Sequence, residues 1–594
     1  MASSILLKLP SSPNPPTTTP SSRHPLLLRN PLPTPSPRDH HHRRHTVTCK
    51  STNNDDDKTP TFLDRRELLL GLTGAYGASA LAPPPSTALP IEAPILADCG
   101  AADLPPGASP TNCCPPLKTS DIVDFVTPPP WAPFRLRPAA HLITDKAYLD
   151  KFALAISRMK ALPDSDPRSF KNQANVHCAY CDGAYDQVGF PDLELQVHNS
   201  WLFFPWHRCY LYFFERILGK LIEDDSFAIP FWNWDHPDGM KMPSIYTDPS
   251  SSLFDPLRDA KHQPPTLIDL DYNDVDPDYT DKEQIDHNLR IMYRQLVSNA
   301  RTPELFMGRP YRAGDQPNPG AGSLENIPHG PVHVWTGDRN QPNKENMGTF
   351  YAAGRDPIFY AHHANVDRMW DVWKAINKNK HKDFTDKDWL ETSFLFYDEN
   401  KRPVRVRVRD ALEPSVMKYG YEQVPLPWLK TKPLVKLGRL TKAARGKKLE
   451  EHVEADVAAS FPLKLKKAVS VTVKRPKVSR SATEKEEAEE VLVVDGIEFS
   501  RDEYVKIDVY VNSAGHEEKV SPGGRELIGS FVSVPHKHKH DKKEKAITTS
   551  LRLGLSEFLE ETGAEGDESI VVSLVPRKGK SKIKIGGLKI EFAS

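Results

Sequence analysis

Six histidines in the middle of the chain form two groups of three, and each group could hold a metal ion. The first group is His177, His198 and His207, and the second is His329, His333 and His363. A neutral imidazole offers one lone pair of intermediate softness, so three of them suit copper, zinc, iron or nickel and leave a coordination position open. Two such sites facing each other could bind O2 between them. With copper, the pair could carry a two-electron oxidation.

The second group has the clearer spacing. His329 and His333 are four residues apart, which places them on one face of a helix. The prolines close to His329 are compatible with its first turn, where a missing N–H costs little. His363 lies in the stretch 355–370, whose bulky residues recur at helical spacing and predict an inward-facing helix.

The first group is embedded in aromatic sequence. His207 falls within the apolar run 201–215, which predicts a buried helix. A histidine inside such a helix must be hydrogen-bonded or bound to a metal. Any one of the six alone is more simply interpreted as a core residue with an ordinary hydrogen bond. Six at these spacings favour a pair of metal sites.

Four segments carry a resemblance to a known family, the plant polyphenol oxidases, which comprise catechol oxidases and tyrosinases with a binuclear type 3 copper centre. These segments are 177–181, 204–208, 329–333 and 356–368. The resemblance covers nearly the whole chain. It implies an α+β protein, in which a mainly α copper domain built on a four-helix bundle precedes a C-terminal antiparallel β-sandwich domain.

The resemblance and the composition together divide the chain into four parts. These are a targeting region 1–90, a binuclear copper domain 91–430, an exposed linker 431–460 and a shielding β-domain 461–594. Runs of β-branched residues between 469 and 574 predict the strands of the last part. Within it, Lys506–Val509 resembles the Lys-Phe-Asp-Val motif of the family. The Lys- and His-rich run 536–540 is interpreted as a solvated hairpin loop rather than a metal site.

The resemblance also implies the metal ligands. The first copper would be bound by His177, His198 and His207, and the second by His329, His333 and His363. A thioether bond between Cys181 and His198 would fix the orientation of that imidazole before copper arrives. The tyrosine motif 419–421 would close the copper domain, with Arg137 as a cation–π partner.

Four of the other cysteines are expected to form disulfides. Cys113 and Cys114 are adjacent and cannot easily bond to each other, so each requires a distant partner. The family pattern implies the pairs Cys99–Cys114 and Cys113–Cys178. A zinc cluster built from Cys113, Cys114, Cys178 and Cys181 is disfavoured because the CxxC half-sites have the wrong form. Cys209, inside the apolar helix, is interpreted as a buried free thiol.

Two further residues match catalytic positions of the family. Phe350 matches an aromatic gate over the second copper, although ordinary core packing would explain it equally well. Glu325 matches the acidic residue that holds a water near the site, and a charge favoured at a helix start is the alternative. Efficient monophenol hydroxylases of the family often carry Asn directly after the first ligand of the second copper, where this chain has Gly330. Oxidation of o-diphenols is therefore favoured over hydroxylation.

The function implied is oxidation of o-diphenols to o-quinones by O2, which is reduced to water. The partners would be O2 and small phenols, and the C-terminal domain would act as an intramolecular inhibitor of a latent precursor. Tyrosinase-type monophenol hydroxylation and reversible O2 binding of the hemocyanin kind remain alternatives with the same six histidines. A zinc or di-iron hydrolase is disfavoured because the ligand sets contain no carboxylate.

Composition and the N-terminal region bear on location and partners. Residues 1–50 are rich in Ser, Thr, Pro, His and Arg and nearly free of acids, as in organelle transit peptides. Arg65 and Arg66 precede an apolar stretch too short and glycine-rich to span a bilayer permanently. Together they predict a chloroplast precursor sent to the thylakoid lumen. The 78 Lys and Arg nearly balance the 79 Asp and Glu, so nothing argues for a nucleic acid partner. The sequence does not specify an oligomeric state.

Overall fold

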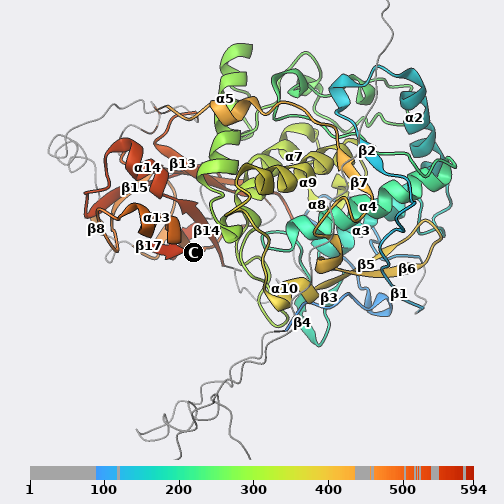
Figure 1. The fold of residues 1–594 in the computed structure, drawn as a ribbon, viewed down its shortest axis with the longest axis horizontal. Helices are drawn as coiled ribbons and strands as arrows, with labels where there is room; N and C mark the ends of the chain where they lie inside the picture. Colours follow the sequence, from blue (N-terminus) through green and yellow to red (C-terminus); the bar gives the residue numbers. More distant parts are fainter. Residues whose placement is uncertain are drawn as a thin grey trace, which may run out of the picture. The chain divides into compact units, whose positions relative to one another are not determined.

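The fold is given by a computed structural model, drawn in Figure 1. It describes residues 89–116, 121–434, 455–456, 461–500, 503–513, 515, 517, 520, 523–536, 548–579 and 583–593. These residues belong to one compact unit, Pro85–Ser594. Nearly all of the predicted targeting region and most of the predicted linker lie outside the described residues.

The part that carries the histidines is mainly helical. Its α-helices are α2 (Lys146–Lys160), α3 (Phe170–Cys181), α4 (Phe203–Leu221), α5 (Asp281–Tyr293), α6 (Pro303–Met307), α7 (Gly330–Thr336), α8 (Phe350–Ala353), α9 (Ile358–Ile376) and α10 (Lys387–Glu391). Serine or threonine caps begin several of them: Ser169 accepts a hydrogen bond from Asn172 N at α3, and Thr280 forms a capping box with Glu283 at α5. None of the helices among the described residues is long and apolar enough to cross a membrane.

Helices α4 and α9 form the centre of the core. Both have 19 residues, and nearly every side chain of α4 from Phe203 to Gly219 is buried, as expected of a helix that is apolar all round. Buried charges on the two helices are paired: Arg208 of α4 donates to Asp367 of α9, and Glu215 of α4 accepts from Arg135 and Arg137. Such pairing is required because an unpaired buried charge is strongly destabilising.

Short strands complete this part of the chain. They are β1 (Val123–Asp124), β2 (Arg135–Arg137), β3 (Asp186–Gln187), β4 (Phe190–Glu194), β5 (Ser393–Tyr397), β6 (Pro403–Arg407) and β7 (Tyr419–Tyr421). Strand β2 pairs in parallel with β7, residue Arg137 opposite Tyr421. The guanidinium of Arg137 lies 4.0 Å from the ring centroid of Tyr419. This confirms the predicted cation–π contact of Arg137 with the tyrosine motif.

The C-terminal part is mainly β. Its elements are β8 (Ala455–Asp456), β9 (Leu463–Lys464), β10 (Val469–Lys474), α13 (Ala482–Glu487), β11 (Glu489–Ile497), β12 (Val505–Val511), β13 (Leu527–Ser533), β14 (Thr549–Gly554), α14 (Ser556–Thr562), β15 (Ser569–Lys578), β16 (Lys584–Ile585) and β17 (Gly587–Ala593). A five-stranded sheet has the order β13-β12-β15-β10-β8, and a three-stranded sheet the order β14-β11-β17. Apolar side chains of both sheets belong to one buried cluster.

The strand pairs of these two sheets are antiparallel with one exception. Strand β8 runs parallel to β10, with Ala455 opposite Val471. The prediction of a purely antiparallel arrangement is therefore wrong at this edge. Residues 455–456 belong to the predicted linker rather than to the predicted β-domain, so the sheet recruits an edge strand from a segment that sequence patterning assigned to neither domain.

Candidate metal centre

The six predicted histidines come together in the buried core. Each has an exposed fraction of 2% or less. Within the first group, the ring of His198 lies 5.2 Å from that of His177 and 5.1 Å from that of His207. Within the second, the ring of His329 lies 4.6 Å from that of His333 and 5.0 Å from that of His363.

The two groups also face each other. The imidazoles of His207 and His363 stack with a centroid distance of 4.2 Å and an interplanar angle of 7°. The rings of His198 and His329 lie 6.0 Å apart. Two metal ions bound by these groups would therefore be neighbours, close enough to share one small ligand.

The secondary structure positions the histidines as the sequence predicts. His177 is on α3, His207 on α4 and His363 on α9. His329 ends a single π-helical turn, Glu325–His329, and stands directly before α7, which carries His333. The predicted short helix beginning at His329 is confirmed.

The hydrogen bonds of the rings fix which nitrogen is free. Backbone carbonyls accept from the Nδ1 atoms of four ligand candidates: Phe350 O from His177, Phe203 O from His207, Glu325 O from His329 and Met347 O from His333. A carbonyl only accepts, so Nδ1 of each ring carries the proton and Nε2 keeps its lone pair. The Nδ1 of His198 lies 3.3 Å from Gln196 Oε1, which gives the same tautomer.

The free nitrogens indicate a binding site for a cation. Among the described residues, Nε2 of His177, His198, His207 and His329 is buried and has no hydrogen-bond partner. The Nε2 atoms of His333 and His363 lie 3.1 Å apart. Buried polar atoms are rarely left unsatisfied, and six converging imidazoles with no acid among them suit copper better than a harder ion.

Burial keeps these imidazoles neutral, as metal binding requires. Desolvation lowers the pKa of His177 to about 3 and that of His333 to about 4, and it lowers those of the other four well below the usual value. No proton has to be displaced from Nε2 near neutral pH, so the lone pairs are available to a metal ion.

Cysteines brace the first group. The structure contains the disulfides Cys99–Cys114 and Cys113–Cys178, the same pairs that the resemblance implies. Cys178 follows His177 directly, so its bridge ties the histidine-bearing helix α3 to the N-terminal segment. Cys181 and Cys209 are buried free thiols. The Cys181 sulfur lies within 4.8 Å of ligand atoms of His177 and His198, and the thioether stays a prediction.

Three domain families match this chain. The common central domain of tyrosinase matches residues 167–376, the polyphenol oxidase middle domain 383–434, and the chloroplastic polyphenol oxidase C-terminal domain 461–592. The chloroplastic polyphenol oxidase of Malus domestica is 57% identical over 559 residues, 92% of each chain, and that of Vitis vinifera 51% identical over 92% of each. The chain belongs to the polyphenol oxidase family.

Solved structures agree with this polyphenol oxidase in fold. Latent apple tyrosinase is 57% identical with a TM-score of 0.75, covering 80% of this chain and all of that one. Latent aurone synthase is 42% identical with a TM-score of 0.78, covering 85% of this chain and 99% of that one. The two histidine groups fit a binuclear type 3 copper centre, and the polyphenol oxidase is accordingly a copper oxidoreductase.

Sequence reasoning missed a seventh histidine of this polyphenol oxidase. One ring nitrogen of His362 lies within 4.8 Å of those of His329, His333 and His363. The side chain is fully buried, and the ring lies 4.9 Å from that of His333. Its place directly before His363 on an inward-facing helix was the available signal, but adjacent helical residues ordinarily face different directions.

The two predicted catalytic residues are both at the centre. Phe350 stacks on His198 at 4.1 Å and meets His177 edge-on at 5.8 Å, so the ligand candidates that its ring is described as contacting belong to the first group. Its place over the second copper stays a prediction. Glu325 is buried and accepts a hydrogen bond from Asn199 N at 2.6 Å, and desolvation raises its pKa well above the usual value.

A segment of the C-terminal part covers this centre. The ring of His536 stacks on Phe350 at 5.0 Å, and Thr349 Oγ1 donates to Pro535 O at 3.1 Å. Val532 and Val534 pack into the core of the copper-binding part. The prediction of a solvated loop is wrong for His536, which is 1% exposed because it packs on the aromatic ring. The rest of that run, 537–540, lies outside the described residues.

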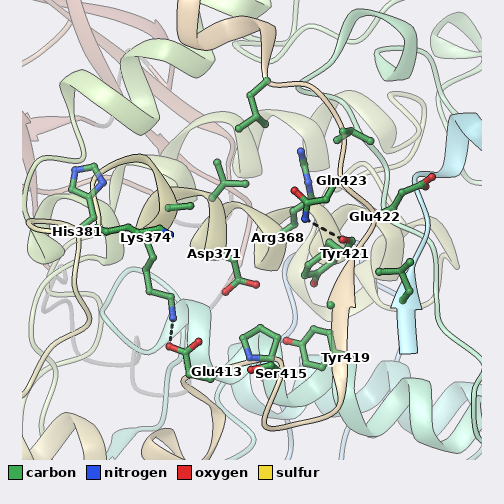
Figure 2. Close-up of a pocket in the computed structure, with 18 of the residues that line it drawn as sticks. Arg368, Asp371, Lys374, His381, Glu413, Ser415, Tyr419, Tyr421, Glu422 and Gln423 are labelled. Carbon is green, nitrogen blue, oxygen red and sulfur yellow. Dashed lines mark hydrogen bonds and ion pairs between the residues drawn. The ribbon is translucent and has the colours of Figure 1, made fainter. Parts of the chain in front are cut away.

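The open pocket drawn in Figure 2 lies elsewhere. It has a volume of about 1030 Å³ and is lined by the C-terminal half of α9, by residues 413–415 and by residues 419–424 around β7. Arg368, Asp371 and Lys374 of α9 lie along it, and Lys374 is paired with Glu413. None of the six ligand candidates lines this pocket. This open pocket is therefore separate from the metal centre.

Proposed function

We propose that this protein is a catechol oxidase, which oxidises o-diphenols to o-quinones at two coppers. Two diphenols each lose two electrons and two protons. One O2 takes up these four electrons and four protons and is reduced to two waters. The observation that carries the proposal is the convergence of six buried imidazoles on one small space, five of them with Nε2 as the nitrogen that keeps its lone pair. Copper supplies the electron transfer and O2 binding, and the chain supplies ligands of fixed tautomer in a dry cavity.

The ligand sets follow from the two groups. His177, His198 and His207 would hold the first copper, and His329, His333 and His363 the second. Helices α3, α4, α7 and α9, which carry four of the six, would form the expected four-helix bundle. A thioether between Cys181 and His198 is supported by the proximity of the two side chains within the first group. It would lock the one ligand that lies outside a helix.

Preference for o-diphenols is supported by Gly330. With no side chain directly after His329, nothing at this position can share with Glu325 the task of holding a water that deprotonates a phenol. Space also favours glycine here, because a Cβ at Gly330 would lie 2.8 Å from Val532 Cγ1. Phe350, stacked on His198, would orient the aromatic ring of a substrate that enters the centre.

Latency would come from the C-terminal part, as an intramolecular inhibitor. His536, Val532 and Val534 occupy the space beside Phe350 and Gly330, where a phenol would have to pass. The five- and three-stranded sheets, which share one core, would form the expected β-sandwich. The boundaries at 430 and 460 are supported by the family matches, which end at 434 and resume at 461.

The location proposed is the chloroplast, as in the names of the Malus domestica and Vitis vinifera relatives. The thylakoid lumen is supported by the twin-arginine signal at Arg65 and Arg66. The oxidising character of such a compartment suits two disulfides.

The decisive experiment compares substrates on the copper-loaded protein. After limited proteolysis of the precursor, O2 uptake is followed with a catechol and with the corresponding monophenol, and copper is counted per chain. Two coppers with rapid O2 uptake on catechol, and little on the monophenol, are expected. Comparable rates on both would establish hydroxylation as well, and O2 binding without turnover would make the protein a carrier.

A further inference from the structure

His362 differs from the six ligand candidates in its hydrogen bonding. The indole N–H of Trp234 donates to His362 Nδ1 over 3.2 Å. An indole nitrogen can only donate, so Nδ1 of His362 must carry the lone pair. A neutral imidazole has one proton, which then resides on Nε2. The tautomer is the reverse of that of His177, His207, His329 and His333.

This tautomer excludes His362 as a ligand through Nε2 and makes it a donor. An Nδ1 atom that accepts a hydrogen bond carries no proton, so the ring is not the imidazolium form. Its Nε2 is buried and has no partner among the described residues. A buried N–H without an acceptor is costly, so a bound ligand is expected to accept from it.

The surroundings identify the class of acceptor. The ring of His362 is parallel to that of His329 at 5.5 Å and perpendicular to that of His333 at 4.9 Å, so it lies among the ligands of the second copper. Two ligand rings and the indole occupy these faces. The species that reach this space in the proposed reaction are O2, water and phenol, all of which offer an oxygen.

We propose that His362 is a seventh functional histidine of the copper centre, which donates its Nε2–H to an oxygen held beside the second copper, and that Trp234 keeps it in the donating tautomer. The inference rests on the proposed copper oxidase function. A positioned donor in a dry site stabilises negative charge that develops on oxygen, and it does so without reorganisation during the reaction. His362 would thus stabilise the negatively charged form of the bound oxygen ligand over its neutral form.

The test uses the full chain loaded with copper, whose kinetics are measured after limited proteolysis as in the activity experiment above, and four variants. H362F removes the donor but keeps a flat ring, and H362Q restores both an acceptor for Trp234 and an N–H. W234F leaves His362 in place but removes the indole N–H that fixes its tautomer. H381F is the matched control, because His381 is also buried and stacks on a tryptophan, Trp373, at 4.8 Å.

Four readouts separate the possible roles: copper per chain, melting temperature of the metal-free protein, kcat against KM for catechol, and the inhibition constant of benzoate, an oxygen-donor probe. For H362F we expect two coppers, an unchanged KM, a kcat lowered about 100- to 1,000-fold and weaker benzoate binding. H362Q should recover part of kcat and of benzoate binding, and W234F should fall between H362F and the wild type.

Two results would overturn the proposal. If H362F loses a copper, His362 is a ligand, and if H362F behaves as H381F in all four readouts, its role is packing. Failure of the underlying function is distinguishable, because the wild-type chain itself would then lack two coppers or fail to oxidise catechol.

Discussion

The two histidine groups present the same donors but are built differently. The first stands on the long helices α3 and α4, with the Cys113–Cys178 disulfide beside His177. The second begins on a single turn and the seven-residue helix α7, where Gly330 faces Val532 of the C-terminal part. The first group is therefore stabilised within its own part of the chain and meets the C-terminal part only through Phe350, on which His536 stacks. In the second group, Gly330 beside His329 lies directly against the C-terminal part.

Removing one ligand from either group should have the largest effect on copper content and activity. H207A and H333A should each lose one of two coppers, and quinone formation should fall by more than the about 100-fold that loss of a supporting residue costs. Metal analysis and catechol oxidation check this, with H381F as the control. If either variant kept both coppers and full activity, the assignment of that group would be wrong.

The next largest effect concerns the docked domain alone. Lys506 on β12 is fully buried, and its Nζ lies 2.8 Å from Asp271 Oδ1 across the interface. K506M leaves this carboxylate buried without its cation, which costs about 3–5 kcal/mol. The uncleaved precursor should gain activity, while the cleaved enzyme should be unchanged. The ratio of uncleaved to cleaved activity is measured from quinone formation before and after limited proteolysis.

The control for this prediction is K584M, which removes a lysine that is half exposed and paired with Glu498. Exposed pairs contribute at most about 1 kcal/mol, so latency should be retained. A K506M precursor as inactive as the wild type would show that docking does not depend on this buried pair.

Removal of the Cys113–Cys178 disulfide should weaken the first histidine group. C113S combined with C178S should lower the free energy of unfolding by about 2–4 kcal/mol. It should also let a chelator remove copper from the first group sooner than from the second. The matched control is C99S with C114S, a bridge that does not adjoin a ligand. Equal copper loss from both groups in the first variant would contradict the separate construction of the two sites.

The smallest effect is a pH dependence of the interface. Burial alone would raise the pKa of Glu557, but the charge of Arg525 and hydrogen bonds from Lys432 and Ser298 hold it at about 2. Because the pKa is lowered, the Glu557 carboxylate stabilises the folded, docked state at pH values above its ordinary pKa of 4.5. This stabilisation is at most about 3 kcal/mol and is lost as the pH falls towards 2. E557Q should flatten the dependence of unfolding free energy on pH between 5 and 3. An unchanged slope would exclude Glu557 as its source.

The sequence predicts the ligand sets because their spacing is local. The four-residue interval of His329 and His333 and the apolar helix around His207 can be interpreted residue by residue. The covering segment could not be predicted in this way, since Thr349 and Pro535 are 186 positions apart and contact only after both domains fold. The partner of Lys506 was inaccessible for the same reason, at a separation of 235 positions from Asp271.

His362 was missed for a different reason. Its neighbour His363 satisfies the metal pattern, and sequence alone cannot tell which of two adjacent imidazoles presents a lone pair. That distinction depends on the indole of Trp234, which lies 128 positions away. The parallel strand β8 was missed because two residues carry no periodicity.

The pairing of β2 with β7 bears on maturation. Arg137, near the start of the catalytic region, is joined to Tyr421, near its end, by neighbouring backbone strands and by a shared bond network through Asp367. Both extremities are thus fastened before residue 434. In the proposed maturation, a cut beyond residue 434 would leave this pairing in place, so activation would not have to disturb the structure of the catalytic part.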